Sequence, residues 1–457
     1  MENRILPILL AERLRRQLEA EFKDFEVALQ QDPVTAVRLN PAKPYQLPWP
    51  THPLSWHPHA RWLETRPAFT MDPGIHAGAY YVQDPATMTI YPAIRDLFRG
   101  PPVRVLDLCA APGGKSTLLA DLLRPQDLLI ANEITPQRYH ILHENLSKWG
   151  LPNVVTTSVS PDNLAKSLGA VFDIILVDAP CSGEGMIRKE PVALSQWNPG
   201  LITQCALRQN NILDAAWSLL APGGTLIYST CTFNPEENID QVTRILRNQQ
   251  DAKSGVHSRT MLPPEVVVIE QGNAYGFQCW PHRIRGEGFF FSILQKEGDR
   301  AQSPSWKSAK ILEKPGSMEV KKLSMLVDTE PSEPVKNQQS GMIYAVPSHH
   351  IPFVDTLIKQ VVKAEPVAAI GHFLKDQFIP HPALALSAND QSVLPDLEMD
   401  LEATLFFLSH QSIPRSQPAG WYRITYQNLG LGWVKAVGNR LNNYYPKHWR
   451  IRHLRDE

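Results

Sequence analysis

Five short apolar runs between residues 103 and 230 constrain the fold of this chain more than any other feature. They read VRVLDL, LLIANE, NVVTT, FDIILVDA and GTLIYST, and each has the length and β-branched content of a buried strand. Amphipathic stretches with helical spacing lie between or after these runs, at 115–124, 136–149, 204–220 and 235–248. Alternation of strands and helices predicts an α/β domain with a mixed, mainly parallel, Rossmann-like sheet covered on both faces.

The rest of the 457 residues is too long for the same hydrophobic core, and its composition changes along the chain. Residues 6–31 have helical spacing, whereas 35–70 hold a strand-like TAVRLN and then a stretch dense in Pro, Trp and His, for which we expect irregular chain. Residues 297–340 are rich in Lys, Glu, Ser and Pro, and we interpret them as a linker with room for partial order. Beyond it, GMIYAVP, PALALS, WYRITYQ and LGWVKAV predict short strands, with a helix near 353–364, in a small α+β unit.

The charge balance, the cysteines and the histidines limit which classes of protein this chain can belong to. The 45 Lys and Arg residues balance 46 Asp and Glu residues, so a nucleic-acid surface has to be a local patch. Five cysteines without C-x-x-C spacing indicate a reducing cytosol. The first residues lack a cleavage site and no stretch approaches about 18 apolar residues, so we expect no membrane insertion and a cytoplasmic location. The 15 histidines have no neighbours that complete a ligand set, and we predict no metal.

The segment DLCAAPGGKS (107–116) follows the first predicted strand and opens a helix. Its small residues let the backbone approach a ligand closely. The glycine spacing is not G-x-G-x-x-G, and Asp107 suits a ligand ammonium better than a pyrophosphate, so we favour S-adenosylmethionine over a dinucleotide. Glu133 ends the second strand, where an acid accepts hydrogen bonds from ribose hydroxyls; an ordinary solvated acid is the alternative.

Two further cysteines follow later strands, Cys181 in DAPCSGEG and Cys231 in STCTFNPEEN. A thiolate that adds to carbon 6 of cytosine activates carbon 5 for methylation, and this chemistry needs a cysteine beside a nucleotide pocket. Asp178 is the candidate that neutralises charge on ring nitrogen 3, either held protonated or through a hydrogen bond. A small buried hydrophobe is the usual role of a free cysteine. Three cysteines keep that interpretation, Cys109, Cys205 and Cys279.

Position along the chain favours Cys231 as the nucleophile. It follows the fifth predicted strand directly and precedes a helix that begins near Pro235, with Asn234 as its cap. N–H groups near that helix start can stabilise a thiolate. In DNA cytosine methyltransferases the Pro-Cys thiol attacks instead, with a Glu-Asn-Val partner segment that this chain lacks.

Several motifs together resemble the Sun-type RNA (cytosine-5) methyltransferases: DLCAAPGGKS, DAPCSGEGMIRKEP, STCTFNPEEN and WPHRIRGEGFF. The likeness is strongest to the RsmF-like branch, which modifies 16S ribosomal RNA, and extends to AVRLN, to HAGAYYVQDPATM and to the C-terminal GWYRITYQNLGLGWVKAVGNRLNNYYPKHWR. It implies a class I methyltransferase fold with a small N-terminal α/β region and a C-terminal PUA-like α+β domain. The division we predict is an N-terminal RNA-binding or covering region at 1–92, a catalytic domain at 93–297, a linker at 298–340 and a PUA-like RNA-binding region at 341–457.

The resemblance also implies roles for single residues. Cys231 forms the covalent adduct with cytosine, Cys181 helps to release the product, and Asp178 contacts the base and lies near the cofactor. Members usually carry another acid or amide near the end of the third strand; here that place falls on 159–160, and we assign the role to Asp162 just beyond. The S-adenosylmethionine contacts implied are Cys109, Ala110, Ala111, Pro112, Gly113, Gly114, Lys115, Glu133, Arg138, Asp162 and Asp178.

A basic and aromatic stretch near the C-terminus predicts RNA contact. Cations that neutralise phosphates, mixed with rings that stack on bases, are typical of RNA-binding surfaces; a solvated basic tail is the alternative. The stretch contains Lys435, Arg440, Lys447, Arg450, Arg452 and Arg455 with Trp433, Tyr444, Tyr445 and Trp449. Arg188 and Lys189 are candidates for holding the substrate backbone, or for an ordinary surface ion pair. The attacking thiol must reach the face of the ring, which favours unpaired or locally opened cytosines.

We predict an S-adenosylmethionine-dependent RNA cytosine-C5 methyltransferase that acts on 16S rRNA in the small ribosomal subunit. A tRNA methyltransferase of the same family and a non-catalytic RNA-binding assembly factor remain alternatives. A DNA methyltransferase is disfavoured because the Glu-Asn-Val element is missing and no target-recognition insert is evident. The polar linker and the lack of a heptad repeat favour a monomer.

Overall fold

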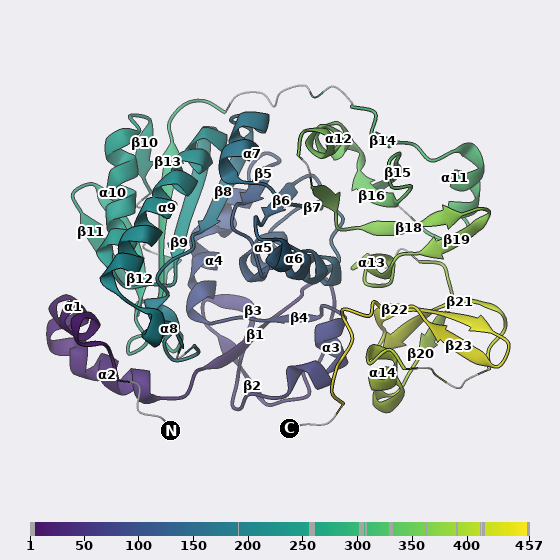
Figure 1. The fold of residues 1–457 in the computed structure, drawn as a ribbon, viewed down its shortest axis with the longest axis horizontal. Helices are drawn as coiled ribbons and strands as arrows, with labels where there is room; N and C mark the ends of the chain where they lie inside the picture. Colours follow the sequence, from purple (N-terminus) through teal and green to yellow (C-terminus); the bar gives the residue numbers. More distant parts are fainter. Residues whose placement is uncertain are drawn as a thin grey trace.

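The computed structural model describes residues 5–190, 192–255, 261–300, 306, 309–328, 332–361, 363–389, 392–411, 413 and 416–454. Figure 1 shows purple and blue N-terminal elements along the lower side, a large sheet with its helices at the left and centre, and a green to yellow C-terminal part at the right. Within the described residues, no helix is both long and apolar enough to span a bilayer.

The predicted α/β domain contains a ten-stranded sheet. Most of its strands are β5 Arg104–Asp107, β6 Leu128–Asn132, β7 Val154–Thr157, β8 Phe172–Asp178, β9 Leu220–Thr230, β10 Ala252–Ser254, β11 Val267–Gln271, β12 Ala274–Cys279 and β13 Phe289–Lys296. The five apolar runs form its parallel centre, in the order β9-β8-β5-β6-β7, and β13, β12 and β11 continue antiparallel beside β9. The predicted mixed, mainly parallel sheet is therefore confirmed.

Helices cover both faces of this sheet, because successive side chains on each buried strand point to opposite sides. Val105 and Leu129 pack in one core cluster, and their chain neighbours Leu106 and Ile130 pack in the other. The first cluster includes residues of α4 Ile90–Ile94, α5 Gly114–Ala120 and α6 Pro136–Trp149. The second includes residues of α7 Pro161–Leu168, α9 Pro199–Leu219 and α10 Ile239–Asn248.

The N-terminal region is more regular than expected. Its elements are α1 Ile8–Leu18, α2 Phe22–Gln30, β1 Thr35–Leu39, β2 Thr51–Leu54, β3 His57–Leu63, α3 Pro73–His76 and β4 Tyr80–Val82. The strands form an antiparallel sheet in the order β2-β3-β1-β4. β1 confirms the strand predicted for TAVRLN, whereas β2 and β3 lie in the stretch after it, for which we expected irregular chain. Pro, His and Trp interrupt the alternating pattern of β2 and β3. Pairing of β3 with β1, and of β2 with β3, supplies the order that the local sequence does not.

Strands and a helix also form within the segment that we interpreted as a linker. They are β14 Leu312–Glu313, α11 Ser317–Leu323 and β15 Ser332–Asn337. β15 pairs with β16 Ile343–Pro347, and the sheet continues through β18 Ala369–Leu374 and β19 Gln377–Pro380. The buried carboxylate of Asp355 accepts four backbone N–H groups from residues 309–312. The described part of 309–337 is therefore ordered, to a greater extent than the partial order that our linker interpretation allowed.

The rest of the C-terminal part contains a second sheet, with four strands in the order β20-β21-β22-β23. The elements of this part are α12 Ile351–Gln360, β17 Ala364–Pro366, α13 Pro382–Ala385, β20 Asp396–Glu398, α14 Leu401–Leu408, β21 Gly420–Tyr426, β22 Leu429–Val437 and β23 Arg440–Asn443. β17 does not join this sheet but pairs with β7, so the C-terminal part completes the ten-stranded sheet. PALALS is also not a strand: Pro382 at the first helical turn and the His381 cap begin α13 there.

Candidate active site

Three predicted residues lie at the ends of neighbouring strands. Asp107 ends β5, Asp178 ends β8, and Cys231 follows β9 directly. These strands are parallel and adjacent in the sheet, so their carboxyl ends share one edge. A cavity of about 660 Å³ opens at this edge and is lined by all three residues.

The two cysteines face each other in this cavity. The sulfur atoms of Cys181 and Cys231 are 3.1 Å apart, and the Cys231 backbone N–H lies 3.4 Å from the Cys181 sulfur. The hydrogen bond with Cys231, together with burial, raises the pKa of the Cys181 thiol well above its ordinary value. Cys181 therefore keeps its proton and can donate it toward the neighbouring sulfur.

Glu237 holds the two cysteine loops together from behind. Its carboxylate accepts hydrogen bonds from the backbone N–H of Ser182 at 2.9 Å and from the side chains of Asn234 and Gln209. Asn234 in turn accepts the Glu237 backbone N–H, as predicted for a helix cap, although the turn here is a three-residue 3₁₀ helix, Pro235–Glu237. Burial raises the pKa of Glu237. This buried network links the loop that carries Cys181 to the loop that carries Cys231.

Lys115 supplies the positive charge nearest to the cysteines and Asp178. Its ammonium nitrogen lies 2.8 Å from Asp178 Oδ2, and the Ser229 hydroxyl donates to Asp178 Oδ1 at 2.9 Å. Burial favours the neutral amine, but the charge of Asp178 and that of a Cys231 thiolate raise the pKa of Lys115. We expected N–H groups near a helix start to stabilise a Cys231 thiolate; the structure adds the Lys115 ammonium as a source of positive charge that the sequence did not indicate.

Asp107 is fully buried, and only one of its two carboxylate oxygens accepts a hydrogen bond. Its Oδ2 accepts the Ser116 hydroxyl at 2.7 Å, whereas Oδ1 has no hydrogen-bond partner among the described residues. Burial raises the pKa of this carboxyl to about 7, against the lowering effect of the Ser116 hydrogen bond. A buried carboxylate oxygen that lines a cavity without a partner fits a cationic ligand group.

The loop after β5 forms the neighbouring wall. Gly113 has φ +116°, a conformation that favours glycine, and a side chain on Gly114 would come within 3.2 Å of the Tyr81 ring. Arg138 donates to the Ala111 carbonyl at 2.6 Å and lies 3.4 Å from the buried Glu133 carboxylate. The loop residues at the cavity are Cys109, Ala110, Ala111, Pro112, Gly114 and Lys115.

Some predicted cofactor contacts do not reach this cavity. Glu133 lies behind Arg138 and accepts the Thr135 backbone N–H, and Gly113 shapes the loop without lining the space. Asp162 is exposed in the first turn of α7 and is not among the residues that line the cavity, so its assignment as a cofactor contact stays a prediction that this geometry does not support.

Sequence reasoning missed the contribution of the N-terminal region to the cavity. Tyr81, Gln83 and Asp84 line it, although the segment HAGAYYVQDPATM that contains them served only to identify the resemblance. Asp84 forms an ion pair of 2.7 Å with Lys189, and Arg188 is buried against Glu287 at 3.0 Å. Both cations that we proposed for the RNA backbone are therefore paired inside the protein.

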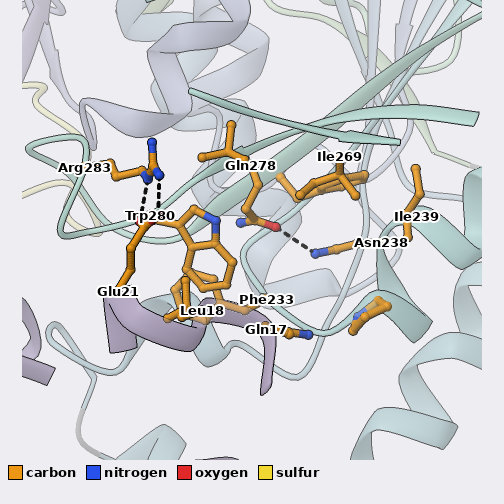
Figure 2. A pocket seen from close by; sticks show the side chains of 13 residues that line it. Gln17, Leu18, Glu21, Phe233, Asn238, Ile239, Ile269, Gln278, Trp280 and Arg283 are labelled. Atoms are coloured by element: carbon orange, nitrogen blue, oxygen red, sulfur yellow. Dashed lines mark hydrogen bonds and ion pairs between the residues drawn. The ribbon is translucent and has the colours of Figure 1, made fainter. Parts of the chain in front are cut away.

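A separate cavity of about 260 Å³ lies behind the loop that follows Cys231. Figure 2 shows Phe233, Trp280 and Asn238 around it, with Glu21 of the N-terminal region bonded to Arg283. The rings of Phe233 and Trp280 stack at 4.6 Å. None of the predicted catalytic residues lines this cavity, and its walls anchor the Cys231 loop to the N-terminal helices.

The aromatic residues predicted to stack on RNA near the C-terminus are mostly buried. Trp433, Tyr445 and Trp449 are at most 8% exposed and belong to the core, because β22 and the chain after β23 pack against helices α13 and α14. Tyr444 is 43% exposed. The cations Arg440, Lys447, Arg450 and Arg452 are exposed, Lys435 is half-buried over Trp421, and Arg455 lies outside the described residues.

Comparison with known proteins agrees with this geometry. The family 16S rRNA methyltransferase RsmB/F matches residues 100–295, the N-terminal domain of 16S rRNA methyltransferase RsmF matches 6–85, and the methyltransferase RsmF PUA domain matches 394–451. A solved structure of a methyltransferase homologue from Pyrococcus horikoshii is 26% identical, with a TM-score of 0.52, and covers 63% of this chain and 94% of that one.

Two curated relatives extend the likeness over nearly the whole chain. Both are ribosomal RNA small subunit methyltransferase F. The protein from Cronobacter sakazakii is 30% identical over 93% of this chain and 92% of its own, and that from Serratia proteamaculans is 31% identical over 87% and 84%. The predicted resemblance is confirmed, and the chain belongs to the RsmF family of small-subunit ribosomal RNA methyltransferases.

Proposed function

We propose that this protein is an S-adenosylmethionine-dependent RNA cytosine-C5 methyltransferase of 16S rRNA that works through a covalent Cys231 adduct. The observation that carries the proposal is the 3.1 Å approach of two thiols beside a cavity with a nucleotide-type loop. A single nucleophile would need only one thiol. A second one at contact distance suits a reaction in which a sulfur–carbon bond has to form and then break.

The residues around the cavity fit S-adenosylmethionine. The unpartnered Oδ1 of Asp107 would accept the ammonium of its amino-acid part, and the glycine-rich turn before α5 leaves room for close backbone approach. Arg138 and the 109–112 loop would hold the remainder. When bound, this cofactor supplies the electrophilic methyl group.

The chain's own groups account for the other steps. The Cys231 thiolate, near the Lys115 ammonium, adds to carbon 6 of cytosine while ring nitrogen 3 takes up a proton. That proton comes from the Lys115 ammonium, and the Asp178 carboxylate, 2.8 Å from it, passes the proton on to the base. After methylation a base removes the carbon 5 proton, the double bond forms again, and the Cys231 sulfur leaves. The protonated Cys181 thiol stabilises the departing sulfur anion.

The names of the relatives favour 16S rRNA over tRNA as the substrate. Incubation of the purified protein with labelled S-adenosylmethionine and separated small subunits, naked 16S rRNA or tRNA tests this directly. We expect label in 5-methylcytosine of 16S rRNA only. Label confined to tRNA would favour the tRNA alternative, and no label in any RNA would favour the non-catalytic assembly factor.

Several broader features belong to the same proposal. A cytoplasmic location agrees with five free cysteines and with a ribosomal substrate. We retain 1–92 and 93–297 as the N-terminal and catalytic regions, although strand β17 of the C-terminal region completes the catalytic sheet. A monomer remains our expectation, which light scattering of the purified chain would test.

A further inference from the structure

A second large groove lies next to the active-site cavity. It measures about 830 Å³, and Met186, Lys189 and Glu190 line both spaces, so a single loop separates them. The N-terminal region provides one side of the groove through residues 31–35 and 63–66, and Pro281 and Arg285 provide the other. A polymeric ligand that extends from the active-site cavity across the 186–190 loop enters this groove.

Two exposed cations of the groove are held by aromatic rings rather than by acids. The Arg285 guanidinium lies 4.0 Å above the Trp62 ring, and that of Arg66 lies 5.6 Å from the Phe69 ring. The other cations, Arg188 and Lys189, pair with Glu287 and Asp84. A guanidinium that lies over a ring without an acidic partner leaves its other face available for stacking on a base and its N–H groups available for phosphate.

Groove acids complement these cations. Glu64 and Glu190 are exposed and also line the space. Carboxylates repel phosphates but accept hydrogen bonds from ribose hydroxyls and from the amino groups of bases. A surface for a duplex backbone would carry cations almost alone. This mixture suits single-stranded RNA, whose base edges and 2′-hydroxyls are accessible.

We infer that this groove binds the single-stranded nucleotides that flank the target cytosine, with a base stacked on Arg285 and a phosphate at Arg66. The inference rests on the proposed function in one respect only, namely that the extruded target base is a cytosine. Methylation of carbon 5 requires the cytosine to be extruded, so its neighbours must be held outside the cavity in an unpaired form. The groove occupies the place where they would lie.

The test compares the double variant Arg66→Ala/Arg285→Ala with wild type in direct binding of 16S rRNA, without methyl donor. We expect about a tenfold or greater loss of affinity and a shallower dependence of binding on salt, with unchanged cofactor affinity. Arg247→Ala is the matched control, an exposed arginine on α10 that lines neither cavity. Arg285→Lys keeps the charge but not the planar stacking surface, so partial recovery is expected.

Ultraviolet cross-linking of bound RNA should label peptides that contain residues 62–66 or 281–285. Unchanged affinity of a folded double variant, judged by its melting temperature, would overturn the inference, as would equal losses for Arg247→Ala. Cross-links to a ribosomal protein at these peptides in small subunits, without RNA cross-links, would assign the groove to a protein partner instead. RNA binding is measured without methyl donor, so the comparison of affinities does not depend on catalysis. If the wild-type protein failed to methylate RNA, the proposed function would be rejected, but the affinities would still test the groove.

Discussion

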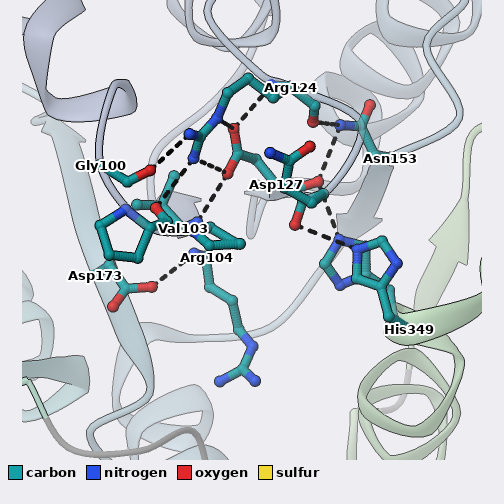
Figure 3. A network of polar contacts seen from close by, with 12 residues as sticks. Gly100, Val103, Arg104, Arg124, Asp127, Asn153, Asp173 and His349 are labelled. Carbon is teal, nitrogen blue, oxygen red and sulfur yellow. Dashed lines mark hydrogen bonds and ion pairs between the residues drawn. The ribbon is translucent and has the colours of Figure 1, made fainter.

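Two fully buried aspartates lie at opposite ends of the adjacent strands β5 and β6, and their carboxylates differ in how many hydrogen bonds they accept. Asp127 precedes β6, and its carboxylate accepts four hydrogen bonds, from the Val103 N–H and from three donors of Arg124. Figure 3 shows this network, with Asn153 and His349 around it. Asp107 ends β5, accepts one side-chain hydrogen bond, from Ser116, and leaves Oδ1 without a partner.

This difference in hydrogen bonding distinguishes the amino end of the sheet, where the buried aspartate stabilises the fold, from the carboxyl end, where the active-site cavity lies. At the amino end of the sheet every acceptor of the buried carboxylate is used, and the network ties the β5 and β6 loops to each other and to His350 of the C-terminal part. At the carboxyl end an acceptor is left open, and two thiols approach each other. An unsatisfied buried carboxylate oxygen costs stability unless a ligand group pairs with it, so its position at the wall of the active-site cavity fits a role in binding.

Replacement of Cys231 by Ala should give the largest effect at the carboxyl edge. Without the sulfur no carbon 6 adduct forms, and we expect methylation to fall by about 10⁴-fold or more. The melting temperature should change little because the side chain lies at a cavity wall. Methyl transfer to 16S rRNA measures the loss, and a serine variant with full turnover would contradict the covalent mechanism.

Cys181→Ala should slow turnover by about 10²-fold or more and let the protein–RNA adduct accumulate. The reason is that the departing Cys231 sulfur loses its hydrogen-bond donor. Denaturing gels with labelled RNA measure the adduct. An adduct that survives denaturation only when Cys231 is replaced and Cys181 is intact would reverse the two roles.

The two aspartates provide a matched pair of substitutions. Asp107→Asn removes the charge that would hold the ligand ammonium, and we expect S-adenosylmethionine affinity to fall by about 10–150-fold in titration calorimetry. Asp127→Asn should leave that affinity unchanged and lower the free energy of unfolding by about 1–3 kcal/mol, since the Arg124 contacts weaken. Equal effects of both variants on affinity would break the comparison.

The last prediction concerns the pH dependence of stability rather than activity. The pKa of Asp107 is raised to about 7 in the folded protein by burial, above its value near 4 in the unfolded chain. The folded state therefore binds more protons, and its stability falls as pH rises from about 4 through 7. Asp107→Asn should thus be more stable than wild type above pH 7, by up to about 4 kcal/mol because the two pKa values differ by about three, and equal near pH 4. Urea unfolding at pH 4, 6 and 8 without ligand measures this; a difference that shrinks with rising pH would contradict it.

Much of the catalytic region could be predicted because its signals are local. Apolar runs predicted all five parallel strands, and motif order placed Asp178 and Cys231 at their ends. Prediction weakened where partners are distant. The apolar run PALALS is short enough to suit strand or helix, and the aromatic residues Trp433 and Tyr445 enter a core that only the folded C-terminal part creates.

The sequence by itself determined the strand order along the chain, the residue types at the strand ends and the family, since these follow from periodicity and contiguous motifs. Tertiary structure alone decided that Lys115 neighbours Asp178, that Glu237 joins the two cysteine loops, and that the N-terminal region closes the cavity. The physical reason is that each of these depends on contacts between segments tens to hundreds of residues apart, and local propensity carries no information about such distances.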